Sequence, residues 1–124
     1  GEPSAKLQKV YDAIQEAHGA TIDMIQFGVR CSEVFNTAAK SMKESGFAYK
    51  SPLVGHGTGI CIHEQPYLGD NDMVIQPGMA FTVEIEWCCR GKGYGSCMRM
   101  EDMVICNKRG CRDITTLTKD FVRI

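Results

Sequence analysis

The hydrophobic pattern of the chain changes its period once, at Gly46, and this change most restricts the fold. Before Gly46, apolar residues recur every three or four positions, as in amphipathic helices. After Gly46, short runs of β-forming residues alternate with glycine, proline and an Asn-Asp pair, as in strands joined by turns. The sequence therefore predicts a single domain, residues 1–124, in which helices come first and a sheet follows.

Two helices are predicted, at about 4–27 and 32–45. Ser4 precedes the first apolar stripe and Ser32 precedes the second, and serine is a favoured N-cap residue because its side chain accepts a free backbone N–H. Gly46 is a natural C-terminal stop for the second helix, because glycine adopts the left-handed conformation that ends many helices.

The rest of the chain, about 52–120, is predicted to form the sheet. Six runs carry the strand pattern: Leu53–Val54, Gly59–His63, Met73–Ile75, Ala80–Cys89, Cys97–Asn107 and Asp113–Leu117. The glycine-rich stretch 91–95 joins the two longest runs, and we interpret it as a hairpin loop rather than a phosphate-binding loop because it does not open a helix. We expect an α+β fold with both helices on one face of a curved antiparallel sheet.

Charge and hydropathy exclude two classes of partner. The chain has 14 Lys and Arg against 15 Asp and Glu, so it lacks the basic excess of nucleic-acid and membrane-surface binders. No apolar run approaches the roughly 20 residues of a membrane span. The chain opens with Gly1 and not with methionine, and we expect a trimmed N-terminus and a longer natural gene.

The cysteines favour a reducing compartment. They are Cys31, Cys61, Cys88, Cys89, Cys97, Cys106 and Cys111. Their number is odd and no C-x-x-C pair occurs, so we expect reduced, mostly buried thiols and a cytoplasmic protein. Disulfides and a zinc knot are the alternatives to this interpretation.

Two of the three histidines lie in the glycine-rich segment 55–64. Glycines beside a histidine let the backbone or a ligand approach closely. His56 and His63 are seven positions apart, so they converge only if the chain bends between them. The alternative for each is an ordinary histidine held by structural hydrogen bonds.

Charged side chains alternate along the two longest predicted strands. Glu84 and Glu86 share one face of the first, and Arg99 and Glu101 share one face of the second. If the strands pair through the 91–95 loop, carboxylates face one another, and either Arg99 or a divalent metal would compensate them. Adding the nitrogen of His56 gives a donor set that suits Mn, Fe, Co or Zn. A solvated sheet face with an Arg–Glu pair is the alternative.

Together these segments resemble the metallopeptidases of the pita-bread fold, which include methionine aminopeptidases, prolidases, aminopeptidase P and creatinase. The resemblance rests on Gly55-His56-Gly57-Thr58-Gly59, His63-Glu64-x-Pro66, Pro77-Gly78-Met79-x-Phe81-Thr82-Val83-Glu84 and Arg99-Met100-Glu101-Asp102. The motifs follow the family's order and spacing, and two helices precede them, so the resemblance covers nearly the whole chain. It implies that the sheet is one half of a pita-bread fold.

The resemblance also implies a role for each residue. His56 and Glu84 correspond to ligands of one metal in a dinuclear centre, and Glu101 corresponds to the carboxylate that bridges two divalent ions, Mn, Co or Zn. His63 corresponds to the histidine that hydrogen-bonds the substrate or the tetrahedral intermediate. Arg99 corresponds to the arginine that orients the carboxylates in the prolidase and aminopeptidase P branch, which we favour over the methionine aminopeptidases.

The chain also departs from the family pattern. Two aspartate ligands come from strands that precede the helices in the family, and Asp12 and Asp23 cannot replace them because both fall in the first predicted helix. Ile85-Glu86 stands where the family usually has Pro-Gly after the ligand glutamate, and Pro52 stands where many prolidases have a histidine. We therefore expect the C-terminal half of a catalytic domain, truncated, metal-poor and inactive alone.

The predicted function is that of part of a dinuclear-metal-dependent aminopeptidase or Xaa-Pro dipeptidase that hydrolyses N-terminal peptide bonds. A non-catalytic module that binds a peptide or a protein is the alternative. The expected partners are a peptide substrate and, across an exposed sheet edge, a second copy of the chain or the missing N-terminal half.

Overall fold

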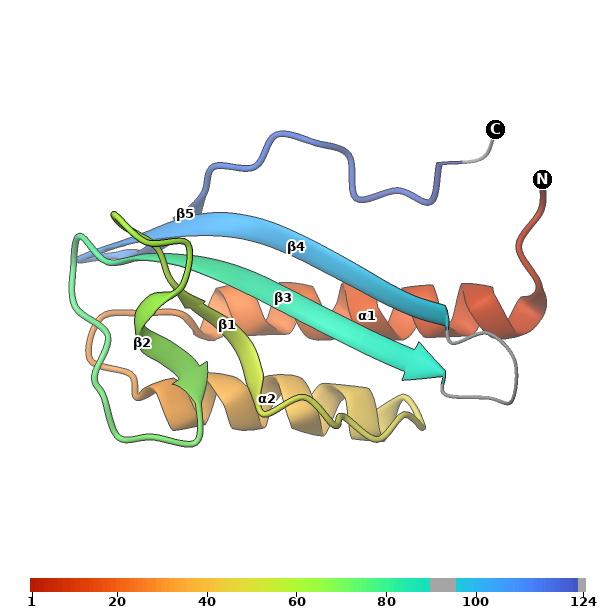
Figure 1. Ribbon diagram of the computed structural model, residues 1–124, viewed down its shortest axis with the longest axis horizontal. Coiled ribbons are helices and arrows are strands. Elements are labelled where there is room, and N and C mark those ends of the chain that lie inside the picture. The colour runs from red at the N-terminus through yellow and green to blue at the C-terminus, as the bar shows by residue number, and fades with distance from the viewer. Residues whose placement is uncertain (90–95, 123–124) are drawn as a thin grey trace.

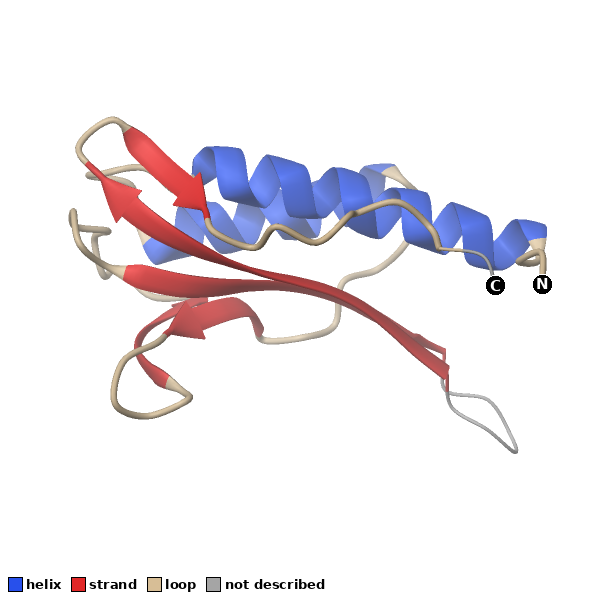
Figure 2. Cartoon of the chain, turned by 90° about the horizontal axis from the view of Figure 1, so that it is seen from above, coloured by secondary structure: helices blue, strands red, loops and turns tan. Residues whose placement is uncertain are grey.

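Two helices lie together on one face of a curved antiparallel sheet (Figures 1 and 2). The structure is a computed structural model that describes residues 1–89 and 96–122. In these ranges the helices and strands are α1 (Ala5–Met24), α2 (Cys31–Glu44), β1 (Leu53–Gly57), β2 (Glu64–Gly69), β3 (Ala80–Cys89), β4 (Ser96–Asn107) and β5 (Gly110–Asp113). The strand order is β2-β1-β3-β4-β5 and every pairing is antiparallel, which confirms the predicted α+β arrangement.

Helix α1 begins where the sequence predicts. The Leu7 backbone N–H donates to Ser4 Oγ at 3.3 Å, so Ser4 caps the helix. Val10, Ile14 and Ala17 form its buried stripe. The helix ends at Met24 rather than at residue 27, because Ile25 takes an extended conformation that sends its side chain into the core.

Helix α2 begins earlier than expected, so the predicted Ser32 cap is wrong. Arg30 is the N-cap residue, and its N–H donates to the Glu33 carboxylate at 2.9 Å, a side-chain cap that leaves Ser32 inside the first turn. The predicted stop at Gly46 is confirmed: this glycine has a φ of 86°, in the left-handed region.

The strand predictions differ from the structure at four places, three before the long strands and one after them. Residues 58–63 form a bent loop rather than a strand, and the next strand, β2, was not predicted; it contains Pro66, which only an edge strand accommodates well. Val74 forms only an isolated bridge with Arg30. The last strand ends at Asp113 and does not run to residue 117. The predicted loop 91–95 lies outside the described residues.

The two long strands separate the core from an open face. Phe81, Val83 and Ile85 alternate along β3 and are fully buried against the helices. The residues between them, Thr82 and Glu84, therefore point to the opposite face of the sheet. This alternation places Glu84 and Glu86 of β3 together with Arg99 and Glu101 of β4 on the side that the helices leave uncovered (Figure 2).

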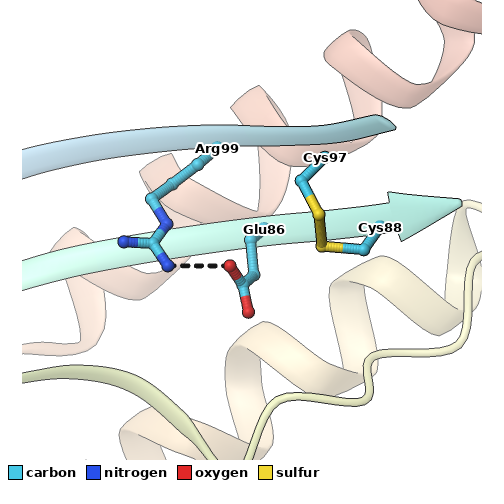
Figure 3. Close-up of a disulfide and its surroundings, with 4 residues drawn as sticks. All are labelled: Glu86, Cys88, Cys97 and Arg99. Carbon is cyan, nitrogen blue, oxygen red and sulfur yellow. Dashed lines mark hydrogen bonds and ion pairs between the residues drawn. A yellow bond between two sulfur atoms is a disulfide. The ribbon is translucent and has the colours of Figure 1, made fainter. Parts of the chain in front are cut away.

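A disulfide joins Cys88 of β3 to Cys97 of β4, so the expectation of reduced thiols is wrong for this pair (Figure 3). The two residues are directly opposite in the strand register, with Cα atoms 4.1 Å apart. Sequence spacing alone does not reveal this proximity, because it depends on how the hairpin pairs. Among the cysteines whose side chains the structure describes, Cys31 and Cys106 are free and buried, Cys111 is free and half-buried, and Cys61 is free and exposed.

Within residues 1–89 and 96–122, neither helix combines the length and apolar character that crossing a membrane requires.

We predict that the Cys88→Ala/Cys97→Ala variant loses about 2 to 3 kcal/mol of unfolding free energy, because a cross-link over nine positions restricts the unfolded chain. Urea denaturation of the oxidised wild type and of the double variant measures the difference. Cys61→Ala, at an exposed free thiol, is the control and is expected to match the wild type. Equal stability of the double variant and the wild type would contradict the prediction.

Candidate functional site

An open cavity of about 400 Å³ lies on the helix-free face of the sheet. Strand β1, the 58–63 loop, β3 and β4 supply its walls. The lining residues are His56, Thr58, Gly59, Ile60, Cys61, Ile62, His63, Thr82, Glu84, Arg99, Glu101 and Met103. All five residues to which the sequence assigns a role, His56, His63, Glu84, Arg99 and Glu101, therefore meet in one place.

Glycines let β1 approach both of its neighbours, β3 and β2, closely enough to deliver His56. A Cβ on Gly55 would lie 2.0 Å from the Thr82 carbonyl oxygen, and one on Gly57 would lie 2.7 Å from the carbonyl oxygen of Gln65. No side chain is tolerated at such distances. The strand therefore holds His56 at the cavity wall, 5% exposed, with its backbone N–H donating to Thr82 Oγ1 at 3.2 Å.

The ring of His56 presents a lone pair to a carboxylate. Its Nδ1 lies 3.0 Å from the Gly57 carbonyl oxygen, which only accepts, so we assign the proton to Nδ1. In the neutral ring Nε2 is then an acceptor, and it lies 2.9 Å from Glu84 Oε1, another acceptor. Two acceptors at this distance need a shared proton or a metal ion between them. A backbone carbonyl that fixes the other ring nitrogen is also the usual support of a metal-binding histidine.

His63 reaches the same place because the chain bends. The ring centroids of His56 and His63 are 4.3 Å apart, so the predicted convergence is confirmed. Glu64 holds the bend: its carboxylate accepts the Cys61 N–H at 2.6 Å and fills the space beside Gly59. Unlike His56, His63 is exposed to solvent and to the cavity.

Arg99 compensates the carboxylates of the open face. Glu84 is opposite Glu101 in the β3–β4 register, and Glu86 is opposite Arg99. The guanidinium lies 2.8 Å from Glu86 Oε2 (Figure 3). It also lies 2.8 Å from Glu84 Oε2 and 3.8 Å from Glu101 Oε2. The hydrogen bond to Glu86 is the largest influence that raises the pKa of Arg99, and the charge of Glu84 adds to it.

Two residues of the site had no predicted role. Thr82 Oγ1 donates to Glu84 Oε1 at 2.9 Å and accepts from the backbone of His56, so it connects the two proposed ligands. Glu86 anchors the guanidinium of Arg99. The alternation that groups Thr82, Glu84 and Glu86 on one face was the available signal.

The donor set fits a divalent metal, but the chain does not group enough donors to complete a site. An imidazole nitrogen and two carboxylates face the cavity, and the Nε2–Oε1 contact of His56 and Glu84 favours a shared cation. In the described part of the chain, however, no three His, Cys, Asp or Glu side chains are arranged to hold a metal ion. The guanidinium of Arg99 already contacts carboxylate oxygens that a metal ion would need as ligands.

Comparison with known proteins identifies the family. The family model for metallopeptidase family M24 matches residues 1–108. The chain belongs to this family. A probable dipeptidase, PepE, of Mycobacterium bovis is 34% identical over 98% of this chain and 32% of that protein. An Xaa-Pro dipeptidase of Lactobacillus delbrueckii subsp. lactis is 31% identical over 98% of this chain and 33% of that protein.

Solved structures of M24 enzymes support the same assignment. The crystallised Xaa-Pro dipeptidase of Bacillus anthracis superposes with a TM-score of 0.89 and 34% identity, over 98% of this chain and 34% of that one. This confirms the pita-bread resemblance and the prolidase branch. The M24 chain described here spans about a third of the length of the relatives it matches.

We predict that Gly55→Ala costs at least about 3 kcal/mol of unfolding free energy, because the new Cβ overlaps the Thr82 carbonyl. Gly19→Ala is the matched control: a Cβ there meets nothing within 4 Å, and alanine in a helix should stabilise the chain by about 0.5 to 1 kcal/mol. Urea denaturation of both variants checks the prediction, and equal effects at the two positions would contradict it.

Proposed function

We propose that this M24 chain is part of a dinuclear-metal-dependent Xaa-Pro dipeptidase or aminopeptidase that hydrolyses N-terminal peptide bonds. One observation carries the proposal: two histidines, two carboxylates and an arginine, each expected from the motifs, line a single cavity. The curated relatives named as Xaa-Pro dipeptidases support the substrate class.

In this proposal His56 and Glu84 would hold one metal ion, and Glu101 would provide the carboxylate shared with a second. Imidazole and carboxylate donors accept Mn, Co or Zn. When bound, two divalent ions activate a water molecule and polarise the scissile carbonyl. Thr82 orients the Glu84 carboxylate through its hydrogen bond, and the Gly57 carbonyl keeps the His56 tautomer whose Nε2 faces the metal.

His63 acts on the substrate, and Arg99 acts on the carboxylates of the site. His63 is exposed on the cavity wall beside His56, where it can donate a hydrogen bond to a substrate carbonyl and to the tetrahedral species formed from it. Arg99 neutralises the repulsion between Glu84 and Glu101 and keeps both side chains on the cavity.

We infer that the chain by itself is inactive or poorly active. It offers three metal donors, and they are not grouped for coordination. It also spans about a third of its relatives. Its proposed partners are a peptide substrate and either a second copy of the chain or the rest of such a protein. Light scattering of the chain, alone and mixed with that remaining part, distinguishes self-association from association with the remaining part.

A second function is favoured by one observation. The carboxylates of the open face already have a cation, because Arg99 contacts Glu84 and Glu86 at 2.8 Å. A chain that satisfies these charges without metal could bind a peptide on the same face without hydrolysing it.

Calorimetric titration with Mn²⁺ and Zn²⁺ tests the metal proposal. We expect weak binding by the wild type, and at least about tenfold weaker binding by His56→Ala and by Glu101→Ala, because each removes a donor. Asp70→Ala, which removes an exposed carboxylate after β2, is the control and should bind as the wild type does. If His56→Ala and Glu101→Ala lose metal binding and Asp70→Ala keeps it, the result supports a preformed half-site, that is, metal donors that this chain arranges by itself.

Two other outcomes would count against the metal proposal. Metal binding no stronger in the wild type than in His56→Ala and Glu101→Ala would refute a preformed half-site in this chain. Binding of an Xaa-Pro dipeptide in the absence of metal, again lost in the site variants, would favour the non-catalytic module.

A further inference from the structure

Asp102, the second carboxylate of the Glu101-Asp102 motif, has no part in the cavity. The two residues are neighbours in β4, so strand alternation sends their side chains to opposite faces of the sheet. Glu101 lines the cavity, whereas Asp102 is 5% exposed on the face that α1 covers. A buried carboxylate is costly unless a counter-charge accompanies it.

The nearest α1 side chain is not that counter-charge. His18 is 1% exposed, and its Nε2 lies 3.5 Å from Asp102 Oδ2, which is too long for a strong hydrogen bond. Burial, more than any neighbour, determines the pKa of His18 and lowers it below the usual value, although Asp102 opposes the shift. Near neutral pH this imidazole is therefore uncharged.

Lys119 supplies the positive charge. Its Nζ lies 2.7 Å from Asp102 Oδ2 and also contacts Asp113 Oδ2 at the end of β5. Burial works against the ammonium, but the contacts with Asp102 and Asp113 raise the pKa of Lys119 overall, so it stays charged. One ammonium thus joins β4 to β5.

The backbone of Lys119 is fixed as firmly as its side chain. Its carbonyl accepts hydrogen bonds from Tyr11 Oη and from Gln15 Nε2, the latter at 3.1 Å, and both donors belong to α1. The Phe121 ring packs edge-on against Tyr11, with centroids 4.9 Å apart. The segment 114–122 accordingly runs back along the molecule to end beside the start of α1 (Figures 1 and 2). It lies beyond residue 108, where the family match ends.

The register places this buried cluster directly behind the carboxylates of the cavity. Val83 pairs with Asp102, and the next pair along the strands is Glu84 with Glu101. A hydrogen bond between His18 and the Val83 backbone ties α1 to the same rung. Any displacement of Asp102 therefore displaces the backbone from which Glu101 leaves β4.

We propose that Lys119 is a positioning residue for Glu101: its half-buried ammonium pairs with the buried Asp102 carboxylate, beside the uncharged His18, and this pair fixes β4 behind the cavity. The role given to Glu101 rests on the proposed function, but the fixing of its side chain does not. The C-terminal segment thereby becomes part of the support of the site.

The experiment compares Lys119→Met, which keeps most of the stem and removes the charge, with Lys119→Arg, which keeps the charge. Lys108→Met, at an exposed lysine in the β4–β5 turn, is the matched control. The first readout is the ¹³C carboxyl NMR signal of Glu101, assigned with Glu101→Gln. The second is Mn²⁺ affinity by calorimetry, at a temperature where thermal unfolding shows every variant folded.

We expect the Glu101 signal to shift and Mn²⁺ affinity to fall on the order of tenfold in Lys119→Met, as for other groups that support a metal ligand from behind. Lys119→Arg should restore both, and Lys108→Met should change neither. If Lys119→Met lowers only the unfolding temperature and leaves the Glu101 signal and the affinity unchanged, Lys119 is structural and the proposal fails.

Two further outcomes remain decisive. If Lys119→Met does not fold, the Asp102→Asn/Lys119→Met variant removes both charges of the pair, and an unshifted Glu101 signal in it would overturn the proposal. If the wild type binds no Mn²⁺, the preformed half-site fails, whereas the Glu101 signal in Lys119→Met still decides whether Lys119 positions that side chain.

Discussion

The pairing of β3 with β4 is the constraint on which the rest of the molecule depends. All ten residues of β3 have partners in β4, so one register decides which side chains face the helices and which face the cavity. A slip of one residue would turn Glu101 toward the core and Asp102 toward solvent. Two features on opposite faces oppose such a slip. The Cys88–Cys97 disulfide closes one end of the ladder, and the contact of Lys119 with Asp102 fixes its middle from behind.

That register creates an electrostatic problem, because it sets Glu84 directly opposite Glu101. Arg99 solves it locally: Glu86 holds one arm of the guanidinium while the other arm reaches Glu84. A divalent ion would solve the same problem by taking Glu84 and the lone pair of His56, and Glu86 would then retain Arg99. The enzymatic and the non-catalytic interpretations thus differ in which cation the Glu84 carboxylate contacts, and not in which residues face the cavity.

The sequence was sufficient for features that depend on local periodicity. The two helices, the two long strands and the grouping of Glu84 with Glu86 and of Arg99 with Glu101 follow from the spacing of apolar residues, and the motifs located His56 and His63. What it did not predict depends on contacts between distant segments. The partner of Cys88, the bend that Glu64 stabilises and the pairing of Lys119 with Asp102 are settled only when the strands and the C-terminal segment are in place. Even the cap of α2 was misplaced: the N-cap residue is Arg30, and its N–H donates to the Glu33 carboxylate.

The two faces of β4 balance their carboxylate charges with different cations. This difference determines on which face one cation can replace another. On the open face the balancing cation is Arg99, whose side chain is 48% exposed, so solvent, a metal ion or a ligand can reach its contacts. On the covered face the contact is between Lys119, which is 34% exposed, and Asp102, which is 5% exposed, and α1 holds the lysine backbone as well. An exposed ion pair contributes little stability and exchanges readily, whereas breaking a buried pair leaves a charge that nothing else compensates. The covered pair can therefore keep β4 fixed while the cation on the open face changes, which is what the metal-binding role proposed for Glu101 would require.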